Sequence, residues 1–584
     1  KAEKELAEFY PEDPDGAKPI AYLWARTVKC ESPNCGAEIP LMRSFWLCKK
    51  ASRKRALRHK VIRAENGPPQ VEFEIFEPKM DRDVHGGTVT RAKATCLCCG
   101  SVLPPERVRS QLAEKRGGTD AIFDASGSRI GGARMLAVVT LHPKEKGRHY
   151  RLPTKHDYKP VWKAQERLNH ILEAWEQAGM TVLCPVPDEP LPPIGTLGFR
   201  VQRYEMLQWV DLFTARQSVT HACASLLIRN ITDERIREVM ALCYGHVVTR
   251  NSSLCVWRYQ ADQEKVESVF SRQALPMVWD FGEAIPISEA TGSISDSIEI
   301  VVRMIERFAP FVSSVGQTLL ADACESPIPD CSASAFFTDP PYYDAIPYSD
   351  LSDFFFVWLK RILPNHPLMR DPFDSSNVLS PKTREAVQDE TKKFNGRWKD
   401  RKFFEDTMSI AFQEGRRLLH DEGIGSIVFA HKTTEGWEAL LNGIIKGGLT
   451  VTGSWPIATE LANRLRARES AALTTSVHLV CRPRHDDAPI GDWGDVLWEL
   501  PERVGIWMER LQEEHVRGAD LVFACIGPAL EIFSRYSKVE TADGREVKLA
   551  EYLEKVWEIV GRMALEQILG TEEARARNGM AGVL

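Results

Sequence analysis

The segment 335–343, AFFTDPPYY, constrains the fold of this chain more than any other stretch. Its apolar start predicts a buried strand, and Asp339, Pro340, Pro341 and Tyr342 follow that strand directly. Each proline fixes its own φ near about −65° and pushes the preceding residue into an extended conformation, so the loop is rigid before any ligand binds. Because ligands in open α/β sheets bind at the carboxyl ends of strands, we expect a functional loop here.

The surrounding residues alternate strand-like and helix-like stretches, which is an α/β pattern. Helices are expected at 350–363, 404–419 and 437–448, and strands at 317–323, 333–339, 425–432, 449–457 and 474–482. Strands that are linked by helices imply a mainly parallel sheet. The last two strands have no helix between them, so they can pair antiparallel at one edge.

A length of 584 residues suggests several domains. The chain shows no run of about 18 apolar residues and no signal peptide pattern, so we expect a cytoplasmic protein that does not bind a membrane. Five regions are expected: 1–150 with clustered Cys, 151–195 with a helix and a Pro-rich linker, 196–315 mostly helical, 316–485 with the α/β part, and 486–584 helical and charged.

Two close pairs of cysteines near the start are each followed by glycine. Such pairs are typical of two knuckles that hold one tetrahedral Zn²⁺, whereas a disulfide framework is not expected without a secretory signal. Cys98 is a competing ligand, Cys48 is a possible substitute for one member, and plain free thiols remain the alternative. The predicted zinc ligands are Cys30, Cys35, Cys96 and Cys99.

A basic run lies between the two cysteine pairs, although the whole chain has a net charge of −6. Residues 49–60 contain seven Lys or Arg and no acid. The run is either a solvated face or a surface that contacts nucleic-acid phosphates, which would position the protein without reading sequence. The candidate phosphate contacts are Lys49, Lys50, Arg53, Lys54, Arg55, Arg58 and Lys60.

The Asp339 loop suits an exocyclic amine of a nucleobase. An ionised carboxylate accepts one N–H of the amine, and a backbone carbonyl such as that of Pro340 accepts the other. The carboxylate also stabilises positive charge that develops on the nitrogen during methylation. Tyr342 can stack on a base, and the base must first leave the duplex. The alternative is a purely structural Pro-Pro turn.

The loop resembles motif IV of amino-methyltransferases, and nearly the whole chain resembles a family of zinc-ribbon-containing adenine-specific DNA methylases with an uncharacterised N-terminal domain. The similar segments include TDPPYYDAIPYSDLSDFFFVWLKR, AHKTTEGWEALL, VTGSWPIATE and AALTTSVHLVCRPR. The resemblance implies a Rossmann-like methyltransferase sheet with an inserted zinc ribbon, S-adenosylmethionine as cofactor, and methylation of adenine N6 in duplex DNA. It also implies a modification or phage-defence setting, with other subunits of such a system as possible partners.

The resemblance assigns further residues. Asp322 and Ala323 would lie near the cofactor, and Tyr343, His431 and Lys432 would lie near the target base. One family feature is missing, since the sequence lacks the Gly-rich turn of the D-P-F-x-G-x-G type that binds the cofactor. In the family this turn lies upstream of the zinc ribbon, so we expect it in a segment before Lys1 or in a partner chain. The alternatives are a cytosine-N4 or RNA methyltransferase and a non-catalytic zinc-ribbon protein that binds nucleic acid.

Overall fold

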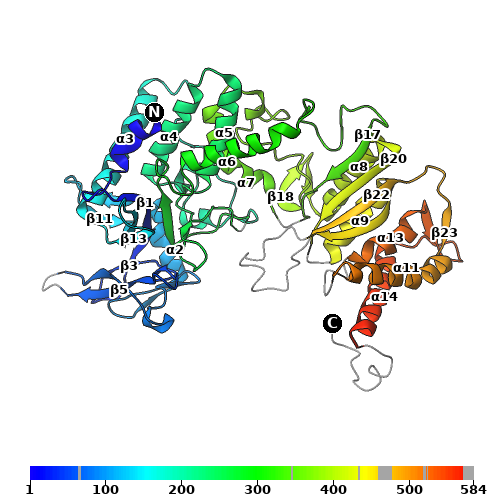
Figure 1. Ribbon diagram of the computed structural model, residues 1–584, viewed down its shortest axis with the longest axis horizontal. Helices are drawn as coiled ribbons and strands as arrows, with labels where there is room; N and C mark the ends of the chain where they lie inside the picture. Colours follow the sequence, from blue (N-terminus) through cyan, green and yellow to red (C-terminus); the bar gives the residue numbers. More distant parts are fainter. Residues whose placement is uncertain are drawn as a thin grey trace. The chain divides into compact units, whose positions relative to one another are not determined.

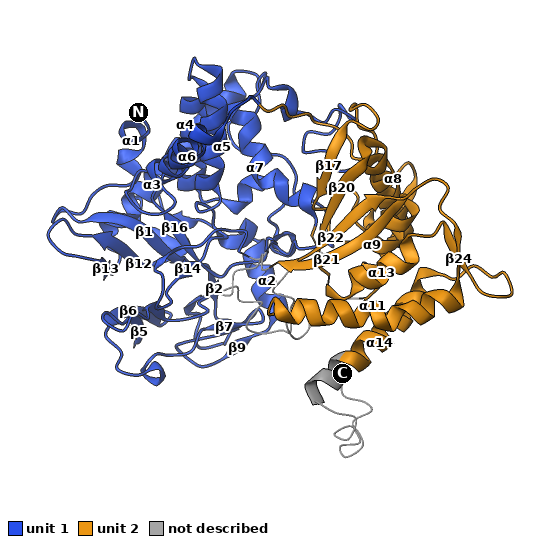
Figure 2. Cartoon of the chain, turned by 45° about the vertical axis from the view of Figure 1, so that its right-hand side comes forward, with its two compact units in different colours: residues 1–315, 347–382 blue, residues 316–346, 383–584 orange. Residues whose placement is uncertain are grey.

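The computed structural model describes residues 1–63, 67–271, 273–343, 346–431, 434–457, 476–516, 521 and 524–569. The chain divides into two compact units (Figure 2). Unit 1 contains residues 1–315 and 347–382, and unit 2 contains residues 316–346 and 383–584. No helix in the described part of the chain has the length and apolar character needed to cross a membrane.

Unit 1 is built on an antiparallel sheet with the order β13-β12-β1-β16. These strands are β1 (Lys18–Ala25), β12 (Arg134–Leu141), β13 (Arg148–Arg151) and β16 (Asp280–Ala284). The helices of the unit are α1 (Ala2–Leu6), α2 (Pro105–Ala113), α3 (Lys155–Gln177), α4 (Ala215–Arg229), α5 (Glu234–Val248), α6 (Ile294–Phe308) and α7 (Tyr348–Ile362). Aromatic rings of Phe213, Phe354 and Trp358 pack together between α4 and α7.

Short strands in unit 1 carry the cysteine pairs and the basic run. β2 (Thr27–Lys29) pairs with β3 (Glu38–Pro40), and β7 (Val89–Thr90), β8 (Lys93–Thr95) and β9 (Val102–Leu103) form a three-stranded sheet. Another three-stranded sheet contains β4 (Trp46–Cys48), β5 (Arg55–Ile62) and β6 (Gln70–Phe76). Two further hairpins are β10 (Ala121–Phe123) with β11 (Arg129–Gly132) and β14 (Trp257–Arg258) with β15 (Lys265–Val266).

The expected Pro-rich linker is packed within unit 1. The guanidinium of Arg361 on α7 donates hydrogen bonds to the carbonyls of Cys184 and Val186 and to the carboxylate of Glu189. Glu189 is buried and also pairs with Lys360, with 2.7 Å between Nζ and Oε1. Residues 347–382 therefore belong to unit 1, although the sequence pattern grouped them with the α/β region.

Unit 2 is built on a mixed four-stranded sheet with the order β17-β20-β22-β21 (Figure 1). These strands are β17 (Ala333–Thr338), β20 (Leu419–Phe429), β21 (Leu449–Ile457) and β22 (Ser476–Pro483). The helices are α8 (Arg401–Leu418), α9 (Thr434–Lys446), α11 (Trp493–Glu513), α13 (Ile526–Ser534) and α14 (Leu549–Leu569). Small strand pairs are β18 (Asp389–Phe394) with β19 (Arg397–Lys399) and β23 (Ile490–Asp492) with β24 (Lys538–Glu540).

One hydrophobic core in unit 2 contains side chains from the sheet and from helices that precede and follow its strands in the sequence. It contains Phe404 and Phe412 of α8, Leu440 of α9, Leu479 of β22 and Ile526 of α13, all of which are buried. The capping carboxylate of Asp400, which accepts a hydrogen bond from the Phe403 amide at 2.8 Å, helps start α8. Residues 486–569 are thus part of the same compact unit as the sheet, as far as the structure describes them.

The expected mainly parallel, Rossmann-like sheet is wrong. Of the three strand pairings in the sheet of unit 2, β17 with β20 is parallel, whereas β20 with β22 and β21 with β22 are antiparallel. The remaining sheets of the described chain are mostly small antiparallel ones. β22 lies between β20 and β21 and is antiparallel to both.

The predicted strand at 317–323 is also wrong. Residues 317–321 have no regular structure, and Leu319 and Leu320 are 69% and 73% exposed. A strand needs a neighbouring strand for its backbone hydrogen bonds, and β17 pairs within the described residues only with β20. Apolar composition alone therefore gave the wrong element here.

Candidate metal centre and the Asp339 loop

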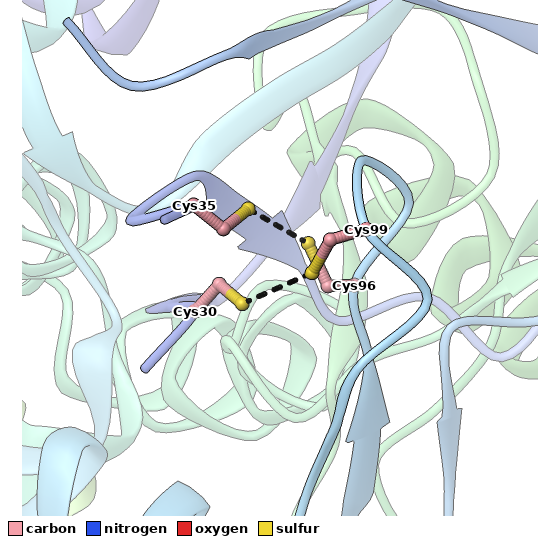
Figure 3. Close-up of side chains that lie close together, drawn as sticks. All are labelled: Cys30, Cys35, Cys96 and Cys99. Carbon is pink, nitrogen blue, oxygen red and sulfur yellow. Dashed lines mark hydrogen bonds between the residues drawn. The ribbon is translucent and has the colours of Figure 1, made fainter. Parts of the chain in front are cut away.

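The four predicted cysteine ligands lie together in unit 1 (Figure 3). Cys30 and Cys35 lie between β2 and β3, and Cys96 and Cys99 lie between β8 and β9. Each pair forms a tight turn that ends in a glycine with positive φ, which is +62° at Gly36 and +75° at Gly100. Glycine adopts this conformation without steric cost, so the sequence pattern of the two knuckles has a direct backbone reason.

The spacing of the sulfur atoms fits a tetrahedral metal ion. Sγ of Cys30 lies 3.6 Å from Sγ of Cys99, and Sγ of Cys35 lies 3.7 Å from Sγ of Cys96. All four sulfur atoms are within 4.8 Å of one another. Four thiolates at about 2.3 Å from one Zn²⁺ would lie about 3.8 Å apart. This group can therefore hold one zinc ion, with three buried ligands and Cys99 exposed.

Cys99 differs in acidity from Cys30 and Cys35. Hydrogen bonds from the hydroxyl and amide of Ser101 lower the pKa of Cys99 to about 6, whereas burial raises the pKa of Cys30 to about 12 and raises that of Cys35 as well. A metal ion binds thiolates, so its binding must release protons from Cys30 and Cys35.

The two alternative ligands lie outside this group. Cys98 is half-buried, with its pKa raised to about 11 first by burial and then by the neighbouring thiols. Cys48 is buried elsewhere and donates a hydrogen bond from Sγ to the carboxylate of Glu264 at 2.8 Å. Neither belongs to the set of four sulfur atoms that surround one point.

Most of the basic run forms ion pairs within unit 1. Lys49 pairs with Asp81, Arg55 with Glu77 and Arg58 with Glu74, and Lys50 and Arg53 both pair with Glu264. Lys54 donates a long hydrogen bond of 3.5 Å to the Lys79 carbonyl, and Lys60 lies opposite Glu72 in the β5–β6 register.

The ion pairs of this basic run differ in how readily the Lys or Arg side chain can leave its acidic partner for another anion. Those of Lys49, Arg55 and Arg58 are made with acids that are well exposed to solvent, so they hold the cations only weakly. Glu264 is buried, and its hydrogen bonds from Cys48 and Arg53 outweigh its burial and lower its pKa. Lys50 and Arg53 are therefore the least suited of the seven to contact phosphates.

The Asp339 loop begins directly after β17, where the sequence predicts it. The prediction that this strand is buried is wrong, since all six of its residues are exposed or half-buried. Asp339 is exposed, Pro340 is buried, and Pro341 and Tyr342 are half-buried. The ring of Tyr342 lies edge-on against Phe429 of β20, with 5.7 Å between the ring centroids. The carboxylate is thus presented to solvent at the end of a strand, with an aromatic ring close by in the sequence.

Tyr343 anchors this loop. Its backbone is left-handed, with a φ of +52°, and its amide donates a hydrogen bond to the Pro341 carbonyl at 3.0 Å. Its own carbonyl accepts a hydrogen bond from the Gln388 amide at 3.0 Å. The buried ring contacts Phe404 and His431 edge-on, with centroid distances of 5.2 and 5.6 Å. Tyr343 therefore connects the loop with α8 and with the end of β20.

The structure brings His431 to the loop. His431 follows β20, and its ring stacks on Phe429 and touches Tyr343. Tyr343 and His431, which the resemblance assigns to the vicinity of a target base, thus lie in one aromatic cluster with Tyr342 and Phe429. Lys432 lies outside the described residues.

The residues assigned to the cofactor do not form a cradle. The carboxylate of Asp322 is paired with Arg384 at 2.8 Å and accepts a hydrogen bond from the Cys324 amide at 2.9 Å. These interactions lower the pKa of Asp322 against the effect of its partial burial. Ala323 is exposed and offers only its backbone. The described residues near Asp322 therefore do not fit S-adenosylmethionine, in keeping with the missing Gly-rich turn.

Sequence reasoning missed the residues that support the loop. Gln388 holds the Tyr343 carbonyl, Phe404 packs on its ring, and Gly436 and Trp437 contact His431. The only signal was a glycine followed by tryptophan near the start of a predicted helix, and that pattern alone does not reveal a contact with His431.

Comparisons of this chain with protein-family models, with curated proteins and with solved structures gave no match.

Proposed function

We propose that this protein is a DNA amino-methyltransferase that acts on adenine N6. The observation that carries the proposal is the Asp339–Tyr342 loop, a carboxylate and an aromatic ring on a proline-fixed turn at the end of a strand. The family resemblance of the sequence points to the same activity.

The chemistry of the loop residues follows from their donors and acceptors. The exposed carboxylate of Asp339 accepts one N–H of the amine, and the Pro340 carbonyl accepts the other. Held by two bonds, the amine keeps its nitrogen lone pair directed away from both acceptors. The carboxylate also stabilises the positive charge that develops on this nitrogen when it becomes methylated.

Tyr342 supplies the surface on which the base rests. Stacking on an aromatic side chain contributes about 1–3 kcal/mol per base and tolerates any base. A base in a duplex does not reach such a ring, so the enzyme takes it out of the stack first. S-adenosylmethionine is the methyl donor of this class, and residues outside the Asp339 loop would bind it.

The decisive experiment measures transfer of labelled methyl groups from S-adenosylmethionine to unmethylated duplex DNA. It compares the protein with its Asp339→Ala variant. We expect transfer by the unmodified protein, a loss of at least about a hundredfold in Asp339→Ala, and N6-methyladenine as the product. N4-methylcytosine as the product would show that the substrate is cytosine and not adenine. Equal transfer by the Asp339→Ala variant would show that the Asp339 carboxylate takes no part in the reaction.

A second candidate is a non-catalytic zinc-ribbon protein that binds nucleic acid. The pairing of Asp322 with Arg384 favours it, because that carboxylate is not available to a cofactor. Salt-sensitive binding of DNA, without methyl transfer by any form of the protein, would support this candidate.

A further inference from the structure

Gly436 provides the space in which the His431 side chain lies. It is the third residue of α9, and a Cβ atom built on it would lie 2.2 Å from Nδ1 and 2.5 Å from Cγ of His431. The φ of Gly436 is outside the left-handed region, so its backbone does not require glycine. The contact with the imidazole ring is therefore the reason for glycine at this position.

Trp437 holds the backbone of the same histidine. Its indole Nε1 donates a hydrogen bond to the His431 carbonyl, with 3.1 Å between the two atoms. The Trp437 side chain is 1% exposed and packs edge-on against Phe429, with 5.1 Å between the ring centroids. The first turn of α9 thus fixes both the ring and the main chain of His431.

His431 in turn contacts the Asp339 loop directly at Tyr343 and is linked to Tyr342 through Phe429. Its ring stacks on Phe429 at 6.1 Å with an interplanar angle of 16°, and Phe429 contacts Tyr342. The same ring meets Tyr343 at 85°. A displaced imidazole would therefore disturb the packing of both tyrosines.

We propose that Gly436 and Trp437 are positioning residues, which hold His431 against Tyr343 and so preset the Asp339 loop in the conformation that receives the base. The base-binding role of the loop rests on the proposed function, whereas the mechanical coupling does not. Neither residue is expected to touch the base.

A double-mutant cycle tests the coupling. In Gly436→Ala the new methyl group collides with the His431 ring, which can turn aside, so the protein still folds. We expect kcat for methyl transfer to fall by at least about tenfold. In the His431→Ala background the added Gly436→Ala change is expected to cost less than about twofold, because the collision partner is gone.

Hydrogen exchange measures the same coupling without activity. The amides of Tyr343 and Gln388 report on the loop, since both donate hydrogen bonds there. We expect Gly436→Ala and Trp437→Phe to speed their exchange by about tenfold or more, and amides of α13 to remain unchanged. Gly245→Ala is the matched control. Gly245 also lies inside a helix, α5, and its Cβ would lie 3.5 Å from Phe355 of α7, which is an ordinary van der Waals contact.

The outcomes separate the two proposals. One outcome is that Gly436→Ala speeds amide exchange in the loop, that this effect disappears in the His431→Ala background, and that no form of the protein transfers methyl groups. That outcome would support the positioning role and reject the methyltransferase proposal. Normal transfer and normal exchange in Gly436→Ala would overturn the positioning role. An equal loss in both histidine backgrounds would also overturn it, since the effect would then not pass through His431.

Discussion

Adjacent tyrosines in the Asp339 loop have different surroundings and therefore different roles. Tyr343 is buried, left-handed in its backbone and packed between α8 and His431. Tyr342 packs edge-on against Phe429 but is only half-buried, so part of its side chain remains accessible. The first residue anchors the loop, and the second is the one that can meet a ligand.

Replacement of Tyr342 tests stacking. We expect Tyr342→Ala to weaken binding of a duplex with an adenine opposite an abasic site by about 5- to 100-fold, the equivalent of one stacked base. Tyr342→Phe keeps the ring and is expected to bind within about twofold of wild type. Fluorescence anisotropy with a labelled duplex measures both. Equal losses in the two variants would indicate that the hydroxyl, and not the ring, matters.

His221 makes the stability of the protein depend on pH. It is fully buried between the Tyr244 hydroxyl and the Asn251 carbonyl, and burial lowers its pKa from 6.5 to about 4. The unfolded chain takes up a proton below pH 6.5, whereas the folded chain does not do so until about pH 4. The free energy of unfolding should therefore decrease as pH falls through this window, by up to about 3 kcal/mol.

Urea unfolding at several pH values checks this dependence. The His221→Gln variant lacks the titrating group and serves as the comparison. Its stability is expected to change less between pH 6.5 and pH 4 than that of the wild type. Parallel pH profiles of the two proteins would contradict the assignment of this dependence to His221.

Single residues were predictable where local geometry defines them. The Pro-Pro loop and the four cysteines were identified because proline fixes the backbone at its own position, and because glycine allows the positive φ that the cysteine turns need. The support of the loop was not predictable, since Gln388, Phe404 and Gly436 reach it through contacts between segments far apart in the chain.

At the scale of elements, the two cysteine knuckles form a small module. The short strands β2–β3 and β7–β9 share an apolar cluster that includes Val28, Ile39 and Leu103, and a bound metal is expected to add to the stability that this cluster provides. The tight turns that carry the ligands depend on the positive φ of Gly36 and Gly100.

Metal analysis of the purified protein should give about one zinc per chain. Cys96→Ser removes a buried ligand and should lose the metal, whereas Cys98→Ser alters a thiol outside the group of four and should retain it. Inductively coupled plasma mass spectrometry measures the content. A zinc-free preparation whose near-ultraviolet circular dichroism matches that of the metal-bound protein would refute a structural zinc site.

Strand pairing was harder to predict than the strands themselves. The strands of unit 2 at 333–338, 449–457 and 476–483 agree with the apolar patterns, but their order and direction depend on where β22 inserts. The stretch 317–323 has the same apolar character as β17 and forms no strand. Periodicity records which residues prefer burial, and it does not record which neighbour is available.

At the scale of the whole molecule, the chain crosses between its two compact units more than once. Residues 347–382 leave unit 2 and pack in unit 1, where Arg361 holds segment 184–189. An ion pair between Asp353, near the start of segment 347–382, and Lys382, its last residue, has 2.6 Å between Oδ2 and Nζ. Unit 1 thus depends on residues that the sequence order assigns to a later region.

Arg361→Met tests this dependence. The guanidinium is buried, and its loss leaves the Cys184 and Val186 carbonyls without this donor and the Glu189 carboxylate paired with Lys360 alone. We expect the free energy of unfolding to decrease by about 3–5 kcal/mol, as for other broken buried pairs. Arg58→Met removes an exposed pair and is expected to cost less than about 1 kcal/mol. Chemical denaturation measures both, and similar small losses would contradict the bracing role of Arg361.

β17 is an edge strand of the sheet in unit 2, and this position affects how the protein behaves in solution. Within the described residues the strand pairs with β20 alone, and Phe337 on it is 68% exposed. An uncovered strand border with apolar side chains readily recruits another polypeptide. Concentrated samples should therefore scatter more light than dilute ones, and any association through this strand would take place next to the Asp339 carboxylate, which directly follows it.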